Sequence, residues 1–586
     1  MPSTRRDFLA RSAALTAGVL LTGCEGNSPQ TLRSVKQSIF QHGVASGDPL
    51  QDRVILWTRA SRVGDGTVID WVVARDPQLQ QVVRRSGDGV DQQPQVVEAA
   101  RDFTVKLDVS GLQPGTTYYY QFTIDGEASP IGRTKTLPSA GVDRVRLGLV
   151  ACSNFSNGWF NAYKVLARRD VDAVLHVGDY FYEYSGSNSP IGRPHEPEKE
   201  TVSLSDYRMR HAQYRTDPDL AEMTRQHPLI AVWDDHESAN NSWIDGAEEH
   251  DPATEGDWDT RKSAAALAYA EWMPIRLPKP QDPLTIWRRF EFGDLVDLFM
   301  LDTRLQRNAP EIETINDPAA DDPSRSMLGA EQKAWLKEGL QQSASRNAAW
   351  RILGQQTMIS PHRGFLQGEV PLPYLPEEVA QEMGIRQGGG NEGTDNWAAY
   401  VAERNELMAF LRDGGIANNV VLTGDIHTAW AADITEDPYT LFNPITPNIT
   451  GVPGYNPITG QGSVGVEFVA MSVTSNNAID FVPDAQTAAE VAAEGYNLGV
   501  ELGNPNVMHH NAAIHGFVLI DATPDRIQGE FWQTGPASIP FADTADATLD
   551  EAWQSRRGAP GAIGTDHLVP ALGASDPRAN APTLAP

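Results

Sequence analysis

The chain has 586 residues, too many for one ordinary hydrophobic core, so two or more domains are expected. Its 40% hydrophobic and 21% charged residues are typical of a globular protein and exclude a chain that is disordered throughout. The 77 acidic side chains outnumber the 47 basic ones, and the net charge of -30 repels nucleic acid, so no stable nucleic-acid binding is expected.

The first 23 residues are predicted to be a signal peptide for twin-arginine export. Arg5 and Arg6 form the arginine pair, and the apolar stretch at 13–21 is far too short to cross a bilayer. A Leu-Thr-Gly-Cys sequence then ends at Cys24 and resembles the lipobox of bacterial lipoproteins. These features predict export by the twin-arginine machinery to the periplasm or cell surface, with membrane contact only through a lipid on Cys24. The alternative is an ordinary cleaved signal in which Cys24 carries no lipid.

Residues 38–140, after a linker at 24–37, show the pattern of an all-β domain. The run at 54–58 is rich in β-branched and aromatic residues, and polar and apolar residues alternate at 104–109. A Pro-Gly turn followed by an aromatic strand at 112–122 is similar to the last hairpin of fibronectin-like sandwiches. We therefore predict a small immunoglobulin/fibronectin-like sandwich.

From residue 141 to 550 the pattern is that of an α/β catalytic domain. Short apolar runs alternate with helical stretches, as expected for strands that are buried on both faces of a sheet. Function in such folds gathers at the carboxyl ends of the strands. The predicted strands are 146–151, 173–177, 229–233, 296–301 and 419–423, and 466–473 and 517–520 are expected to complete a second sheet. The predicted helices include 159–168, 263–272 and 403–411, the predicted surface insertions are 364–396 and 438–462, and 551–586 is predicted to be an Ala/Pro-rich tail, loosely packed from about 557.

Ionisable side chains follow almost every predicted strand of this domain. They are Cys152, then Asp179 and Tyr182, then the Asp-Asp-His-Glu sequence at 234–237, and finally Asp425 and His427. A single aspartate after a strand usually forms a turn or caps a helix, but their joint occurrence indicates one shared site. Burying these groups without compensation would cost several kcal/mol each, so bound cations are expected. If Cys24 carries lipid, Cys152 has no intrachain partner, which favours a metal ligand over an inert buried thiol.

Taken together, these motifs resemble the PhoD-like alkaline phosphatases of the calcineurin-like metallophosphoesterase superfamily. The matching sequences lie at 40–49 (Phe-Gln-His-Gly-Val-Ala-Ser-Gly-Asp-Pro), 151–153 (Ala-Cys-Ser), 178–183 (Gly-Asp-Tyr-Phe-Tyr-Glu), 233–237 (Trp-Asp-Asp-His-Glu), 301–304 (Leu-Asp-Thr-Arg) and 424–427 (Gly-Asp-Ile-His). They follow the family's order from about 40 to 521. The resemblance implies a four-layer αββα metallophosphoesterase sandwich and a site that holds Fe3+ with one or two Ca2+ ions.

The resemblance also implies which side chains bind each metal. The implied iron ligands are Cys152, Asp179, Tyr182 and His427, an anionic set that suits a trivalent ion. The implied calcium ligands are Asp235 and Asp425 with a shared Asp179, and Asp234 and Asn240 are candidates for a further calcium.

The expected reaction is hydrolysis of phosphate esters by metal-activated water, in which two cations clamp the phosphoryl oxygens. His236 is the expected proton donor or electrostatic stabiliser at the leaving oxygen. Arg304 is expected either to bind a phosphate oxygen or to form a structural salt bridge, with equal weight. His510 and His515 could line the pocket mouth, although packing roles are favoured for both.

Two other functions remain open from the sequence. A diesterase or phospholipase D-like enzyme of the same fold would act on teichoic acid, phospholipid or nucleic acid rather than on a small monoester. A non-catalytic lipid-anchored binding protein would keep an inactive metal site, and the presence of every expected ligand type argues against it.

Overall fold

The computed structural model describes residues 38–88, 94–310, 318–362, 395–442, 454–477, 480, 486–558, 566–575 and 583–586. The predicted signal peptide and linker, residues 1–37, lie outside these ranges, as does nearly all of the predicted insertion at 364–396. Residues 39–586 form a single unit. Among the helices within the described ranges, none has the length and apolar character needed to cross a membrane.

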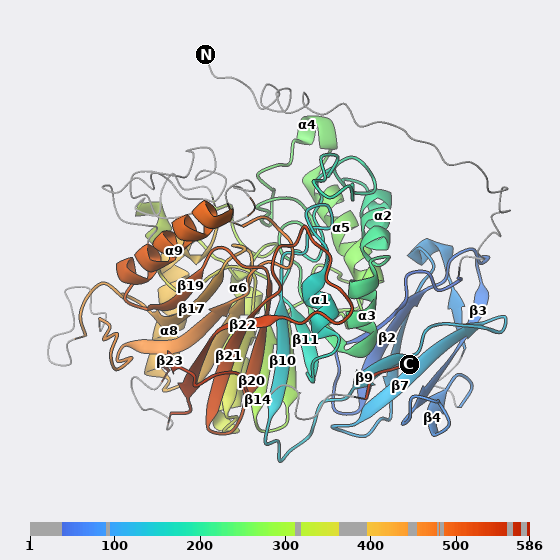
Figure 1. The fold of residues 1–586 in the computed structure, drawn as a ribbon, viewed down its shortest axis with the longest axis horizontal. Coiled ribbons are helices and arrows are strands. Elements are labelled where there is room, and N and C mark those ends of the chain that lie inside the picture. The colour runs from blue at the N-terminus through green and yellow to red at the C-terminus, as the bar shows by residue number, and fades with distance from the viewer. Residues whose placement is uncertain are drawn as a thin grey trace, which may run out of the picture. The chain divides into compact units, whose positions relative to one another are not determined.

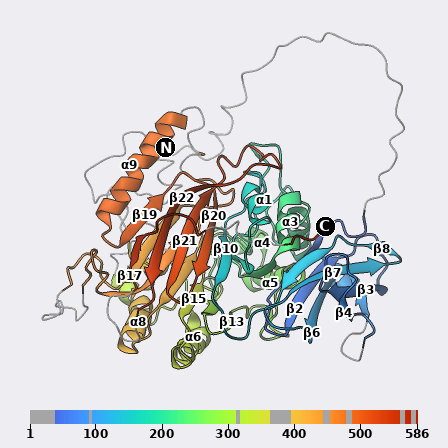
Figure 2. The same cartoon turned by 60° about the horizontal axis from the view of Figure 1, so that its bottom comes forward.

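The catalytic region is built on two sheets (Figures 1 and 2). The first has ten strands in the order β23-β22-β21-β20-β10-β11-β12-β1-β2-β6, and Figure 2 shows β20, β21 and β22 side by side. The second has seven strands in the order β13-β14-β15-β16-β18-β17-β19. The strands of the first sheet are β1 (Val44–Gly47), β2 (Arg53–Arg59), β6 (Thr104–Ser110), β10 (Val145–Val150), β11 (Ala173–His176), β12 (Pro228–Ala231), β20 (Gly516–Ala522), β21 (Arg526–Gln533), β22 (Thr548–Arg556) and β23 (Leu568–Pro570). Those of the second are β13 (Arg288–Phe292), β14 (Val296–Met300), β15 (Trp350–Gly354), β16 (Asn419–Thr423), β17 (Ala429–Thr435), β18 (Ser463–Val469) and β19 (Val507–Asn511).

The two sheets pack face to face, and the alternation of side chains along each strand decides which residues meet. Phe531 of β21 lies 6.3 Å from Phe468 of β18, measured between ring centroids, so this face of the first sheet covers the second. The opposite face of β10 is turned toward a helix, because a Cβ added to Gly148 would lie 2.7 Å from Leu166 Cδ1. Buried residues of both sheets belong to one hydrophobic cluster, so the core between the sheets is continuous.

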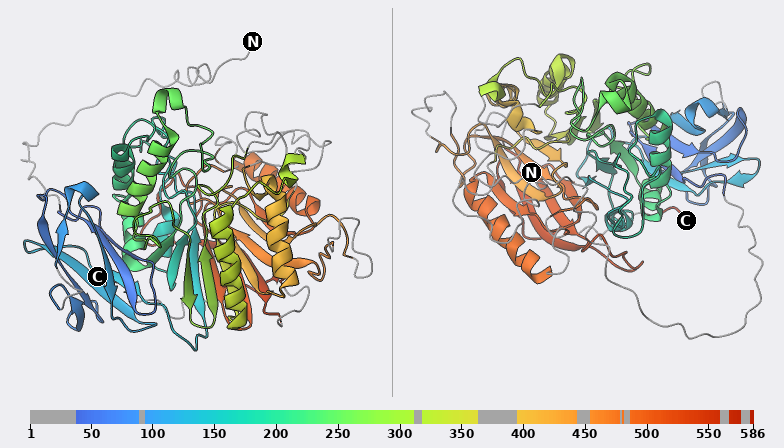
Figure 3. Two further views of the ribbon diagram at one scale, coloured as in Figure 1. Left: turned by 180° about the vertical axis from the view of Figure 1, so that it is seen from behind. Right: turned by 90° about the horizontal axis from the view of Figure 1, so that it is seen from above.

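Helices cover the outer faces and complete four layers, which confirms the predicted αββα sandwich. Gly339 of α6 packs on Phe299 of β14, and Leu407 and Leu411 of α8 join the same core cluster. Figure 3 shows α6 and α8 in front of the second sheet in its left view. The helices are α1 (Asn161–Leu166), α2 (Leu204–Tyr214), α3 (Pro218–Gln226), α4 (Pro252–Glu255), α5 (Trp258–Trp272), α6 (Gly329–Ser345), α8 (Val401–Asp413) and α9 (Gln486–Gly503), with short 3-10 turns at Ala99–Arg101, Pro318–Asp321 and Trp397–Ala399.

The N-terminal region is a β-sandwich, as predicted, but it shares a sheet with the catalytic region. Its second sheet contains β3 (Thr67–Ala74), β4 (Val82–Arg85), β5 (Gln95–Val97), β7 (Thr117–Ile124), β8 (Glu127–Ala128) and β9 (Gly132–Lys135). Strand β1 of the sandwich pairs in parallel with β12, so β1, β2 and β6 extend the ten-stranded sheet. Buried Asp48, directly after β1, binds Arg288 of β13 through two hydrogen bonds of 2.7 and 2.8 Å. The sandwich is thus tied to both sheets of the catalytic region.

Two sequence predictions about the last third of the chain are wrong. The run at 517–520 lies in β20, which pairs with β10 in the first sheet and does not complete the second. The chain after 557 is not loosely packed where it is described, because β23 pairs with β22 and Leu568 N donates to buried Asp433 of β17. The first prediction failed because an apolar run does not specify the strand with which it pairs. The second failed because buried Asp433 needs hydrogen-bond donors, and the end of the chain supplies one.

Candidate metal centre

The predicted site residues follow five strands that end at the same edge of the two sheets. Strands β10, β11 and β12 are mutually parallel, as are β14, β15, β16 and β18. Their carboxyl ends therefore meet on one side of the sandwich. The segments that follow carry Cys152 after β10, Asp179 and Tyr182 after β11, Asp234–Glu237 after β12, Arg304 after β14, and Asp425 and His427 after β16.

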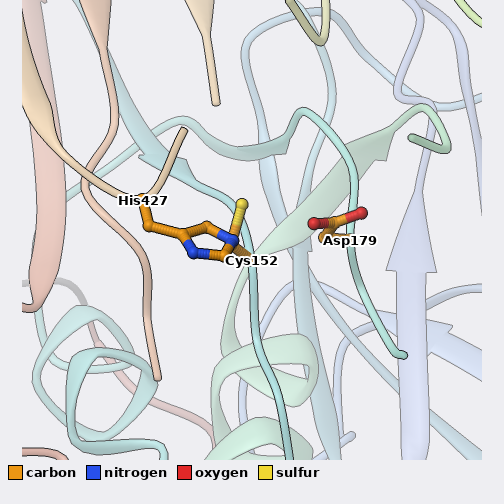
Figure 4. Close-up of side chains that lie close together, drawn as sticks. All are labelled: Cys152, Asp179 and His427. Carbon is orange, nitrogen blue, oxygen red and sulfur yellow. The ribbon is translucent and has the colours of Figure 1, made fainter. Parts of the chain in front are cut away.

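The first group of side chains combines a thiol, a carboxylate and an imidazole, which Figure 4 shows, with the phenol of Tyr182. One ligand atom each of Cys152, Asp179 and His427 lies within 4.8 Å of the others, although the three residues come from separate segments. Tyr182 Oη lies 2.7 Å from Asp179 Oδ2, to which it donates, and 3.0 Å from His427 Nε2. His427 Nδ1 lies 2.9 Å from the carbonyl oxygen of Asn476, so Nδ1 is the protonated nitrogen and Nε2 faces the group.

A second group is dominated by carboxylates and adjoins the first. Oxygens of Asp234, Asp235 and Asp425 lie within 4.8 Å of one another, and those of Asp179 and Asp235 form a similar set with a ring nitrogen of His236. Asp179 belongs to both groups, as a bridging ligand would. The structure thus brings together every predicted metal ligand.

Four of these residues adopt the left-handed backbone conformation, with a positive φ angle. The φ angles are 59° at Cys152, 53° at Asp179, 71° at Asp425 and 61° at His427. Non-glycine residues rarely adopt this conformation, and when they do it costs of order 1–3 kcal/mol each, which surrounding contacts must offset. Such strain clusters at functional sites, and here it turns each side chain toward the same point.

Glu237 supplies contacts that hold two of the loops, a role that the sequence did not predict. Its carboxylate accepts hydrogen bonds from the backbone N–H groups of Asp179 at 3.0 Å, Asp234 at 2.8 Å and Tyr180. Gly178 is needed beside it, because its φ is 121° and an added Cβ would lie 2.3 Å from Asp234 Cβ. The sequence predicted that Glu237 follows a strand, but it could not distinguish a metal ligand from a residue that holds a loop in place.

His236 is held by a second buried glutamate, Glu183, whose role the sequence also did not predict. His236 Nδ1 lies 2.7 Å from Glu183 Oε2, and the other Glu183 oxygen accepts from Asn240 N at 2.8 Å. The imidazole ring also packs on Tyr182, 4.1 Å between centroids. With Nδ1 occupied, Nε2 is the nitrogen left to face Asp179 and Asp235.

The electrostatics of the centre fit bound cations. Burial raises the pKa values of the Cys152 thiol and the Tyr182 phenol well above their usual values, and it raises that of Asp425 to about 6. Burial also lowers the pKa of His427 to about 4, which keeps its imidazole neutral. Asp179 Oδ1, Asp234 Oδ2 and Asp235 Oδ1 are buried and have no hydrogen-bond partner among the described residues. Carboxylate oxygens in this position are satisfied by metal ions, and a thiolate and a phenolate would be stabilised by the same charge.

Arg304 adopts the salt-bridged alternative rather than a free phosphate-binding position. Its guanidinium is fully buried, and it donates to Asp234, to Asp395 and, at 2.6 Å, to Asp425. All three sides of the guanidinium are therefore engaged by carboxylates. Asp395 carried no signal in the sequence, because it lies more than ninety residues from Arg304.

Three further candidates are held by contacts within the protein. Asn240 Oδ1 accepts a hydrogen bond from Tyr184 Oη at 3.1 Å. His510 is buried edge-on against Trp430, 4.2 Å between ring centroids. His515 is buried with Nε2 2.8 Å from an oxygen of Asp480. The contacts of the two histidines agree with the packing roles that were favoured for them.

Comparison with known proteins places this centre in a family. The sequence model of the PhoD-like phosphatase family matches residues 147–531, and that of its N-terminal domain matches 26–138. Alkaline phosphatase D of Bacillus subtilis (strain 168) is 31% identical over 530 residues, which cover 87% of this chain and 79% of that protein. A solved structure of PhoD matches with a TM-score of 0.72 and 26% identity, covering 94% of this chain and 95% of that one. The chain therefore belongs to the PhoD-like phosphatase family, and it is a phosphoester hydrolase.

Proposed function

We propose that the chain is an exported, metal-dependent phosphatase of the alkaline phosphatase D type, acting on small phosphate esters. The observation that carries the proposal is the meeting of a thiol, a phenol, an imidazole and several unpaired carboxylate oxygens at one edge of the sheets. The strongly acidic chain repels a phosphate ester at long range, so binding one needs local positive charge, which cations held at this edge would supply.

The proposed cations are Fe3+, held by Cys152, Asp179, Tyr182 and His427, and Ca2+, held by Asp179, Asp235 and Asp425, with Asp234 as a candidate for a second Ca2+. Soft and anionic donors favour the trivalent iron, and hard carboxylate oxygens favour calcium. When bound, such cations neutralise the phosphoryl oxygens and make a water molecule nucleophilic at neutral pH.

The chain's own residues handle the leaving group. The oxygen of water forms a bond to phosphorus, and the bond from phosphorus to the leaving oxygen breaks with its electron pair on that oxygen. His236 Nε2 is the group placed to give that oxygen a proton, and the proton released by the water restores His236 through solvent. Glu183 keeps Nδ1 engaged and so fixes the ring with Nε2 toward the site.

The assay that tests this function compares nitrophenyl phosphate with bis-nitrophenyl phosphate, using natively exported, metal-loaded protein. We expect the monoester to be hydrolysed at least as fast as the diester. A diester rate far above the monoester rate would replace the proposal with a diesterase or phospholipase D-like activity. Metal-loaded protein that hydrolyses neither ester would refute it in favour of a binding protein.

Glu183→Gln is expected to lower kcat by about 10- to 100-fold, because an orienting partner of a catalytic imidazole has effects of that size. The loss should be largest for alkyl phosphates, whose leaving oxygen needs a proton, and smallest for nitrophenyl phosphate. The measurement is kcat across a series of leaving groups. Glu530→Gln, at a buried glutamate of β21 that bonds Ser575 and Trp532, is the matched control and should change no rate. A uniform loss across the series would contradict the role of Glu183.

Purified protein is expected to be coloured, because ferric iron bound to thiolate and phenolate absorbs visible light. Tyr182→Phe and Cys152→Ser should each weaken the visible band, and elemental analysis should find iron and calcium in the unaltered protein. Active protein that is colourless and loaded with zinc would disprove the proposed metals.

Export and lipid attachment are part of the proposal and rest on residues 1–24 alone. The Arg-Arg pair and the Leu-Thr-Gly-Cys sequence support twin-arginine export and a lipid on Cys24. Labelling cells with a radioactive fatty acid should mark the protein, and Cys24→Ala should abolish the label. Label that persists in this variant would show that the lipid is attached elsewhere.

A further inference from the structure

Arg304 is a fully buried cation at the centre of the carboxylate group. It lies among Asp234, Asp235 and Asp425, the last of which accepts from Nη2 at 2.6 Å, while Asp235 Oδ1 is 3.7 Å from the same nitrogen. Asp235 and Asp425 are proposed calcium ligands, and Asp234 is the candidate ligand for a second calcium. One guanidinium therefore neutralises the same carboxylates that a divalent cation would bind.

The fourth carboxylate near Arg304 is that of Asp395, which belongs to a different part of the chain and is also bound by a second arginine, Arg307. Asp395 accepts from Arg304 Nη1 through Oδ2 and from Arg307 Nη2 through Oδ1. Arg307 Nη1 also donates to the carbonyl oxygen of Asp395 at 2.6 Å, and Arg307 Nε donates to Ser242 O at 3.0 Å. Arg307 thus fixes Asp395 through both its backbone and its side chain, and Asp395 is not among the proposed metal ligands.

We infer that Arg304 is an internal cation that competes with calcium for the carboxylates of Asp234 and Asp425, and that Asp395, fixed by Arg307, retains the guanidinium when calcium binds those carboxylates. The inference rests on the calcium ligands of the proposed function. Arg304 and calcium are like charges that share carboxylates, so each must weaken the binding of the other. Asp395 acts in the opposite sense, since it draws the guanidinium away from the shared carboxylates. Arg304 and Asp395 are positioning residues in this scheme, and neither needs to touch the phosphate ester.

Calcium titration of the chelator-treated full chain by calorimetry, with no phosphate ester present, tests the inference. Arg304→Gln should bind Ca2+ about tenfold more tightly, because removing a competing cation removes a coupling of the usual size. Asp395→Asn should bind Ca2+ about fivefold more weakly, because Arg304 then pairs more strongly with Asp234 and Asp425. The two substitutions are thus expected to shift the calcium affinity in opposite directions. Arg325→Gln, where the arginine donates to the carbonyl oxygens of Ala399 and Ala309, is the matched control and should not change it.

Thermal unfolding of the same samples gives a second readout. Without calcium, Arg304→Gln should melt at a lower temperature than the unaltered protein, because buried carboxylates lose their counter-charge. Its gain in melting temperature on adding calcium should be larger, as tighter binding requires. Weaker or unchanged calcium binding by Arg304→Gln would overturn the inference. If that variant does not fold, Asp395→Asn decides alone: weaker binding supports the inference, and equal or tighter binding overturns it. A protein that responds as expected but hydrolyses no ester would refute only the proposed function.

Discussion

Asp179→Asn is expected to lower kcat/KM for nitrophenyl phosphate by at least about 10³-fold, because Asp179 lies in both groups of candidate metal ligands and the cations it would hold would stabilise the transition state by several kcal/mol. Asp179 belongs to both groups of metal-capable side chains, and its Oδ1 is buried with no hydrogen-bond partner among the described residues. An asparagine keeps the shape of the side chain but removes the charge that would bridge two cations. The content of bound metal, measured by elemental analysis, should fall together with the rate.

The control for this substitution is Asp217→Asn. Asp217 is also a buried carboxylate, but it caps helix α3 and pairs with Arg193 at 2.6 Å, away from the metal-capable groups. This variant should keep its metals and its kcat, although it should melt at a lower temperature. If Asp179→Asn kept full metal content and activity, the bridging role of Asp179 would be withdrawn.

Gly178→Ala is expected to disable the enzyme without altering any ligand. The backbone at Gly178 has a φ of 121°, a region that costs an L-residue of order 1–3 kcal/mol. An added Cβ would also lie 2.3 Å from Asp234 Cβ and 2.6 Å from Asp234 N, so the loops after β11 and β12 would have to separate. Since Asp179 N and Asp234 N both donate to Glu237, that separation breaks the contact that sets the two ligand loops against each other. We expect loss of bound metal, at least about a 100-fold loss of kcat/KM, and a lower melting temperature.

Gly126→Ala separates the effect of strain from that of the clash. Gly126 has a φ of 81°, in the turn between β7 and β8, and an added Cβ there would meet no atom within 4 Å. This variant should lose some stability but keep its metals and its rate. Equal losses of activity in the two variants would show that general destabilisation, rather than the spacing of the two loops, causes the effect.

The shared ten-stranded sheet gives the N-terminal sandwich a part in positioning the site. Strand β1 is the parallel neighbour of β12, whose carboxyl end leads to Asp234 and Asp235. Asp48, at the end of β1, binds Arg288 of β13, the neighbour of β14. The sandwich therefore contacts both sheets that carry the site, and its strands are continuous with the catalytic core rather than connected to it by a flexible linker.

The sequence by itself predicted the type of fold, which is confirmed, and the members of the candidate metal centre. Apolar runs that end in ionisable residues predict parallel strands with a site at their carboxyl ends, because strands buried on both faces leave only their ends for polar groups. Cys152, Asp179, Asp235, Asp425 and His427 were identified in this way, and the resemblance to a known family supplied their assignment to iron and calcium.

Only the tertiary structure decided which polar groups meet. Glu183 and Glu237 lie in the motifs that pointed to the site, but the sequence did not distinguish their roles from those of ligands, and Asp395 gave no signal. Their roles depend on donors that lie far along the chain or on a neighbouring loop. The partner of β20 and the pairing of Arg304 with carboxylates were likewise fixed by packing. The physical reason is that local patterns encode burial and periodicity, whereas a buried charge is satisfied by whichever group the completed fold brings within hydrogen-bonding distance.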